Sequence, residues 1–103
     1  MYEVSPKDVP ANAQLIDVRE DDEYAVDHAR GVKHIPMGDI PARYQEIDPD
    51  QDVYVICKAG GRSMQVCGYL ENALGWDKII NVAGGTDAWR EQGLPMDTPN
   101  KTQ

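Results

Sequence analysis

Short apolar segments alternate with helical segments along this chain, which leaves few folds open to it. Five segments have the apolar character of strands: residues 2–4, 14–18, 32–35, 53–57 and 79–82. Four others have helical character: residues 21–26, 40–47, 63–74 and 86–92. Strands that alternate with helices predict an α/β fold in which a central parallel sheet carries helices on both faces. In such folds ligands bind beyond the carboxyl ends of the strands.

The segment 63–74 has the most regular helical pattern. Apolar side chains recur at three- and four-residue spacing along one face, at Val66, Cys67, Leu70, Ala73 and Leu74. Gly75 then supplies a stop signal. The place of Cys67 on the apolar face favours a packed core thiol over a redox partner for Cys57.

The length of the chain bounds its organisation. Its 103 residues suffice for one compact domain and are too few for two domains of ordinary size. The 41% of hydrophobic and 27% of charged residues are near the average for soluble globular proteins. We therefore expect one domain over residues 1–103, with a flexible polar tail from about residue 97.

Charge and cysteine content narrow the partners and the compartment. The net charge of -8 disfavours nucleic acid and acidic membranes, because both are bound chiefly through clustered Lys and Arg. Two cysteines are few for a disulfide-dependent secreted domain and suggest a reducing compartment. Residues 1–10 lack the pattern of a secretion signal, and no apolar run approaches the length of a membrane span. We expect a cytoplasmic protein.

The segment 57–63 carries the candidate chemistry, because it joins a buried strand to an amphipathic helix. It reads Cys57, Lys58, Ala59, Gly60, Gly61, Arg62 and Ser63. Two glycines let the backbone curl so that successive N–H groups point inward and form an anion-binding nest. The start of the following helix adds unpaired amides at the same place, Ser63 can cap that helix, and Arg62 offers a fork of donors suited to an oxyanion.

A cysteine at the head of such a loop is expected to have a lowered pKa and to act as a nucleophile. The same cradle of amides would stabilise a terminal sulfur anion. A persulfide on Cys57, formed by attack on a sulfur donor, could therefore persist until an acceptor arrives. This double displacement requires no metal and no other cofactor. Lys58 either guides an anionic donor or simply reaches solvent.

The chain resembles the rhodanese family over almost its whole length. Four stretches, in the family's order, resemble its signatures: residues 15–20 with Glu23 and Tyr24; His28 with Gly31 and residues 34–36; residues 57–63; and residues 81–85 with Trp89. Two departures lie away from the loop, since Asp27-His28-Ala29 replaces the usual Gly-His-Ile and Lys33-His34 the usual Ala-Asn. The resemblance implies a three-layer rhodanese-like fold and a sulfurtransferase.

The spacing of Cys57 and Arg62 bears on the type of reaction. Sulfur-transferring members of the family place the Arg five positions after the Cys, as here, whereas related phosphatases use a loop one residue longer. The resemblance thus implies that thiosulfate or a persulfide donates sulfur and that a thiol or cyanide accepts it, with a protein as a further candidate acceptor. Two alternatives stay open: a non-catalytic binding or sensor module, and a phosphatase or arsenate reductase on the same scaffold.

The remaining polar and aromatic positions favour structural roles. Asp17, Arg19 and Glu20 follow a strand, where a charged cluster more often builds an ion pair or caps the next helix than lines a pocket. His28 and His34 lack the neighbours that would make a metal site or a general base. Trp89 reads as a core anchor, and residues 84–85 read as a turn that allows close backbone approach.

Overall fold

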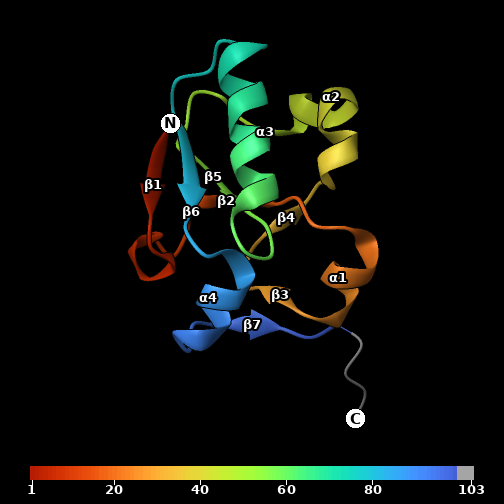
Figure 1. Ribbon diagram of the computed structural model, residues 1–103, viewed down its shortest axis with the longest axis vertical. Helices are drawn as coiled ribbons and strands as arrows, with labels where there is room; N and C mark the ends of the chain where they lie inside the picture. Colours follow the sequence, from red (N-terminus) through yellow and green to blue (C-terminus); the bar gives the residue numbers. More distant parts are fainter. Residues whose placement is uncertain (100–103) are drawn as a thin grey trace.

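The computed structural model describes residues 1–99 and contains a five-stranded parallel sheet in the order β1-β6-β5-β2-β4. Its strands are β1 (Tyr2–Val4), β2 (Gln14–Asp17), β4 (Lys33–His34), β5 (Val53–Ile56) and β6 (Ile79–Val82). Because all pairs are parallel, the carboxyl ends of the strands meet at one edge of the sheet (Figure 1). The expected α/β fold with a central parallel sheet is confirmed.

Both faces of this sheet are covered, which explains why its middle strand, β5, is buried at every position. Successive side chains of a strand point to opposite faces. Ile16, Val53 and Val55 pack with the helix α3 (Gly61–Asn72) on one face. On the other face a second cluster joins neighbouring positions of the same strands to Trp89.

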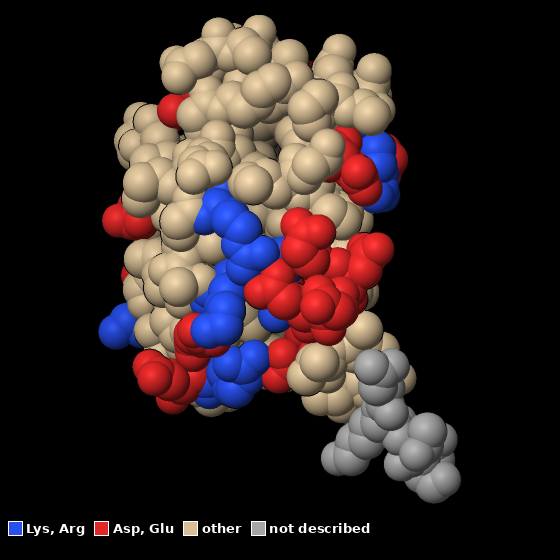
Figure 2. All heavy atoms as spheres, turned by 45° about the vertical axis from the view of Figure 1, so that its right-hand side comes forward, with Lys and Arg blue, Asp and Glu red and all other residues tan. Residues whose placement is uncertain are grey.

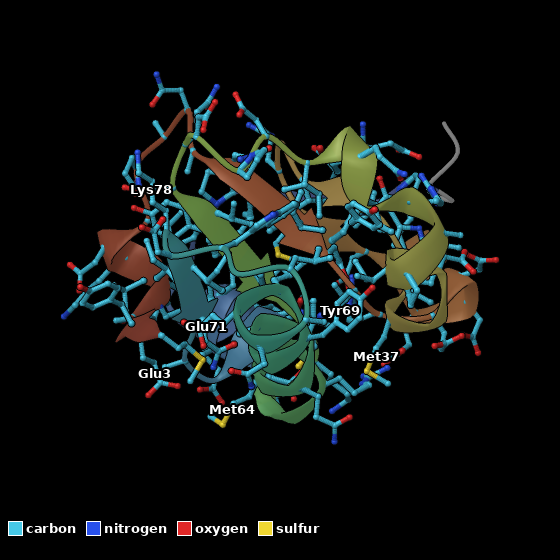
Figure 3. The ribbon with its side chains drawn as sticks, turned by 90° about the horizontal axis from the view of Figure 1, so that it is seen from above. Glu3, Met37, Met64, Tyr69, Glu71 and Lys78 are labelled. Carbon is cyan, nitrogen blue, oxygen red and sulfur yellow. The ribbon has the colours of Figure 1, made fainter. Side chains whose placement is uncertain are left out.

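Within the described residues 1–99, four helices and three 3-10 turns form the outer layers. The helices are α1 (Asp21–Val26), α2 (Ile40–Arg43), α3 and α4 (Gly85–Glu91). The turns are Pro6–Asp8, Met37–Asp39 and Tyr44–Glu46. Seen from above, α3 lies on the same side of the sheet as α2, with Tyr69 on the flank that faces Met37 (Figure 3). No helix within residues 1–99 is long and apolar enough to cross a membrane.

Several expected element boundaries were wrong by one or more residues, among them the three that follow. The third helix begins at Gly61 rather than at residue 63, because Gly60 takes the N-cap position with a φ of 114° that only glycine adopts readily. The helix expected over 40–47 ends at Arg43 and continues as a 3-10 turn. The strand expected over 53–57 stops at Ile56, which leaves Cys57 as the first residue of the loop.

A second, two-stranded antiparallel sheet was not expected from the sequence. It pairs β3 (His28–Ala29) with β7 (Met96–Asp97), and Asp97 lies opposite His28. The indole Nε1 of Trp89 holds this return strand by donating to the carbonyl oxygen of Pro95 at 2.8 Å. The expected tail therefore does not begin at residue 97, and its last four positions, 100–103, lie outside the described residues.

Candidate functional site

The loop between β5 and α3 wraps around the sulfur of Cys57, whose residue is only 1% exposed. The amide of Gly60 donates to Cys57 Sγ at 3.0 Å, and Ser63 Oγ lies within hydrogen-bonding distance of Cys57 Sγ, at 3.3 Å. The positive φ of Gly60 makes this turn possible. Of the expected cradle, Gly60 and Ser63 contact the sulfur directly, and the backbone amide of Ala59 also hydrogen-bonds to it. Lys58, Ala59 and Gly61 are otherwise exposed.

These contacts decide the protonation of the thiol. Burial raises the pKa of Cys57, but the hydrogen bond with the Ser63 side chain and those with the amides of Ser63, Gly60 and Ala59 lower it. The hydrogen bonds prevail, so the pKa lies below the ordinary value of a cysteine. The thiolate therefore forms more readily at Cys57 than at an ordinary cysteine.

Ser63 was expected to cap the start of α3, but Gly60 occupies the N-cap position instead. Ser63 lies in the first turn of α3, two residues after Gly61, and its hydroxyl turns inward. Ser63 Oγ lies 2.5 Å from Asn81 Oδ1 and 3.1 Å from the carbonyl oxygen of Gly60. The hydroxyl is thus fixed between β6 and the loop, with its oxygen against Cys57.

The junction between β6 and α4 braces the loop from below. The amide of Thr86 donates to the carbonyl oxygen of Cys57, and the amide of Asp87 donates to that of Lys58 at 3.0 Å. A Cβ atom on Gly85 would lie 2.5 Å from the Lys58 carbonyl oxygen and in closer collision with that of Cys57. The expected close-approach turn at residues 84–85 is confirmed, and the backbone it approaches is the Cys57 loop.

Both cations of the loop are paired with carboxylates. Arg62 donates from Nη1 to Glu23 Oε1 at 2.7 Å and from Nη2 to Glu23 Oε2 at 2.8 Å. Lys58 Nζ donates to Asp87 Oδ2 at 2.9 Å. The Arg62 guanidinium lowers the pKa of Glu23 to about 2. Basic and acidic side chains accordingly lie side by side on one face of the molecule (Figure 2).

The charged cluster after β2 is structural, as expected. Arg19 Nη2 donates to Asp17 Oδ2 at 2.9 Å in a buried ion pair. Glu20 takes the N-cap position of α1, and its amide donates to Glu23 Oε1 at 3.0 Å. This second contact orients the carboxylate that holds Arg62.

The two histidines enclose an aromatic ring. Tyr24 stacks on His28 with ring centroids 3.8 Å apart and on His34 with centroids 4.1 Å apart. A ring nitrogen of each histidine also meets a backbone oxygen, that of Tyr24 for His28 and that of Arg19 for His34. The structural interpretation of both residues is confirmed, and the second departure from the family pattern, at His34, forms part of this stack.

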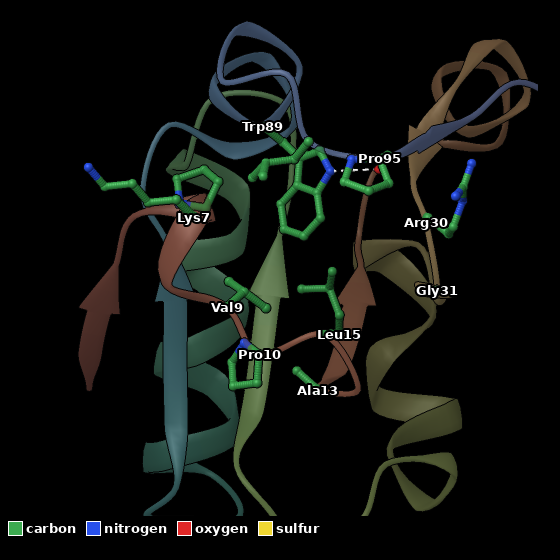
Figure 4. Close-up of a pocket in the computed structure, with 12 residues that line it drawn as sticks. Lys7, Val9, Pro10, Ala13, Leu15, Arg30, Gly31, Trp89 and Pro95 are labelled. Carbon is green, nitrogen blue, oxygen red and sulfur yellow. Dashed lines mark hydrogen bonds between the residues drawn. The ribbon is translucent and has the colours of Figure 1, made fainter.

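Cys67 and Trp89 also take the places expected of them. Cys67 is fully buried on the α3 face of the sheet, and burial raises its pKa to about 12. Trp89 anchors the opposite cluster. Beside it lies an apolar hollow of about 360 Å³ between the Pro6–Asp8 turn, Leu15 and Pro95 (Figure 4). No residue of the loop 57–63 lines that hollow.

Three contributors to this site were missed by the analysis of the sequence alone: Glu23, Asn81 and Thr86. Asn81 lies near the end of β6, Thr86 in the helix after β6, and Glu23 in the helix after β2. Because β2 and β6 both neighbour β5, all three residues lie near the same edge of the sheet as Cys57. The strand order supplies this information, because residues after adjacent parallel strands converge. The sequence pattern of separate strands does not contain it.

Comparisons with known proteins agree with this architecture. Residues 6–92 match the family model described as the rhodanese-like domain. YtwF of Bacillus subtilis (strain 168), provisionally named a sulfurtransferase, is 46% identical over 81 residues that span 79% of this chain and 77% of that protein. A sulfurtransferase of Allochromatium vinosum is 39% identical over 85 residues, 82% of this chain and 78% of that one.

A solved structure has the same fold. The crystal structure of SSP1007 from Staphylococcus saprophyticus superposes with a TM-score of 0.79 at 36% identity and covers 92% of this chain and 99% of that one. The agreement in sequence therefore extends to the fold on which the site is built. The chain belongs to the family of rhodanese-like domains.

Proposed function

We propose that the protein is a sulfurtransferase that carries sulfane sulfur as a persulfide on Cys57. The observation that carries the proposal is the Cys57 sulfur itself, held at a strand end by the Gly60 amide and the Ser63 hydroxyl with a lowered pKa. A nucleophilic thiolate and a set of inward donors are the two requirements of such a carrier. The names of the Bacillus and Allochromatium relatives support the same class of activity.

The transfer runs in two displacements. The Cys57 thiolate attacks the outer sulfur of thiosulfate, the sulfur–sulfur bond breaks, and sulfite leaves with the bonding electron pair. With a persulfide as donor, a thiolate leaves instead and takes up a proton. Cyanide or a thiolate then attacks the outer sulfur of the persulfide on Cys57. The sulfur–sulfur bond breaks, the acceptor departs with the sulfur as thiocyanate or a new persulfide, and the Cys57 thiolate is restored.

Loop size and shape support sulfur rather than phosphate as the group bound. Only four residues separate Cys57 from Arg62, and the curled backbone brings the Gly60 amide within 3.0 Å of the sulfur. A narrow cradle of this kind suits one added sulfur atom better than a tetrahedral oxyanion. Protein thiols are candidate acceptors too, because Lys58, Ala59 and Gly61 place the outer side of the loop at the surface.

The test is thiocyanate formation from thiosulfate and cyanide, beside intact-mass analysis of the donor-treated protein. We expect turnover and one added sulfur in the wild type and in Cys67→Ser, and neither in Cys57→Ser. Full turnover by Cys57→Ser would overturn the mechanism. Absence of both turnover and added sulfur with thiosulfate and with alkyl persulfides would point to a binding module, and hydrolysis of an aryl phosphate would point to a phosphatase.

A further inference from the structure

The Arg62 guanidinium beside the Cys57 loop is already occupied by an anion. Its two terminal nitrogens each donate to one oxygen of Glu23, at 2.7 and 2.8 Å. This bidentate pair occupies the two parallel N–H donors with which a guanidinium binds an oxyanion. A donor that needs the same fork must displace the carboxylate first.

A hydrogen bond within the first turn of α1 fixes the Glu23 carboxylate independently of Arg62. Glu23 lies in the first turn of α1, and its Oε1 also accepts the hydrogen bond from the Glu20 amide. With its pKa lowered to about 2 by Arg62, it stays ionised throughout the neutral range. The charge of Arg62 is therefore compensated whenever the protein is folded near neutral pH.

The other cation of the loop adds little free positive charge. Lys58 is paired with Asp87 at 2.9 Å, and the protein as a whole carries a net charge of -8. Attraction for an anion at Cys57 thus comes mainly from backbone amides and the Ser63 hydroxyl. A dianionic donor therefore finds both Lys58 and Arg62 already paired with a carboxylate.

We propose that Glu23 sets the donor specificity of Cys57, because by holding Arg62 it disfavours dianionic thiosulfate and leaves alkyl persulfides as the preferred donors. The inference rests on the proposed sulfur transfer. Attack of the Cys57 thiolate on R–S–SH breaks its sulfur–sulfur bond, yields R–SH once the departing thiolate takes the proton, and leaves Cys57–S–S⁻. The protonated donor adds no charge, so one negative charge is present throughout this step; an ionised donor, R–S–S⁻, would raise the total to two. The same attack on thiosulfate gathers three negative charges at the loop before sulfite departs.

The experiment compares two donors, thiosulfate and the persulfide of 2-mercaptoethanol, by the rate at which intact mass shows one sulfur added to the protein. The variant is Glu23→Gln, since Gln is also accepted at this position of a helix N-terminus. The matched control is Asp21→Asn, which removes one carboxylate charge from the same turn at a side chain that does not contact Arg62.

We expect the wild type to react about tenfold or more faster with the alkyl persulfide than with thiosulfate at equal concentration, the size of effect that one charge-assisted hydrogen-bonded pair supports. Glu23→Gln should raise the rate with thiosulfate by about tenfold and change the rate with the persulfide far less. The ratio of the persulfide rate to the thiosulfate rate should therefore fall. Asp21→Asn should leave the ratio within about twofold, because exposed charges are well screened.

The possible failures separate cleanly. If neither donor adds sulfur to the wild type, the proposed function itself is wrong. If sulfur is added but thiosulfate is the better donor, or if Glu23→Gln and Asp21→Asn change the ratio equally, the transfer stands and the role of Glu23 does not.

Discussion

The amide of Thr86 donates to the carbonyl oxygen of Cys57 at 2.7 Å, and the Thr86 hydroxyl donates to the same oxygen at 3.0 Å. The end of β5 is thereby tied to the first turn of α4. Because the carbonyl belongs to the residue whose sulfur faces the loop, this pair fixes the direction in which the sulfur points. The helix after β6 is thus part of the scaffold of the site.

Gly85→Ala should disrupt this brace. A Cβ there would collide with the carbonyl oxygens of Cys57 and Lys58, and the residue has a φ of 60°. We expect a loss of stability of about 1–3 kcal/mol, as for other strained or overpacked substitutions, together with slower alkylation of Cys57. Urea unfolding and iodoacetamide labelling measure the two effects.

The control for that prediction is Gly68→Ala. Gly68 lies within α3, and a Cβ there would meet nothing within 4 Å. This change should stabilise the protein by about 1 kcal/mol or less, because alanine is the better helix former. Equal destabilisation by both substitutions would contradict the close contact between Gly85 and the loop.

Ser63→Ala should raise the pKa of Cys57. The Ser63 side chain supplies the largest of the hydrogen-bond contributions that lower it. The variant also leaves the buried Asn81 oxygen without its Ser63 contact, for which we expect a stability loss of about 1–3 kcal/mol. The pH dependence of alkylation should shift upward in Ser63→Ala and stay unchanged in Gln65→Ala, an exposed position on the same helix.

The sequence predicted the sheet and the loop well because their signals are local. The segment that became β5 is apolar throughout, and β2 and β6 each contain a pair of adjacent apolar residues. The glycines of 57–63 mark a turn before an amphipathic helix. Cys57 could therefore be placed at a strand end from its neighbours alone. Cys67 could be assigned to the core by the spacing of the apolar residues around it.

The parts that could not be predicted depend on distant pairing. The two residues of β3 pair with two of β7, which lie far along the chain, and neither segment is long enough to show a periodic pattern. Arg62 and Glu23 are 39 positions apart, and their ion pair follows from the placement of α1 beside α3. Contacts between residues so far apart in the sequence can be predicted only when the strand order is known.

Asp17→Asn should cost more stability than any exposed charge. Arg19 is almost fully buried, and Asp17 is its ion-pair partner, so the substitution leaves the guanidinium without a compensating charge. Removal of one member of a buried pair typically costs about 3–5 kcal/mol. Asp97→Asn, which breaks the exposed pair with Arg30, should cost less than about 1 kcal/mol in the same urea titrations.

The ion pair between Glu23 and Arg62 should make the free energy of unfolding depend on pH in the acidic range. Arg62 lowers the pKa of Glu23 from 4.5 to about 2, so the carboxylate binds its proton less readily in the folded state. Its contribution is present above about pH 5 and is lost as the pH falls toward 2. Glu23→Gln should therefore be less stable than the wild type by about 1 kcal/mol near neutral pH, and the difference should shrink on acidification. A difference that is constant with pH would exclude this contribution.

The two cysteines should differ sharply in reactivity although both are buried. Amides and the Ser63 hydroxyl lower the pKa of Cys57, whereas burial raises that of Cys67 to about 12. Alkylation requires the thiolate, so iodoacetamide near pH 7 should label Cys57 alone in the folded protein and both cysteines in urea. Peptide mass analysis distinguishes the two sites. Labelling of Cys67 at a comparable rate in the native state would mean that α3 opens readily, and the Cys57 loop, which begins that helix, would then lack the rigid support on which its chemistry depends.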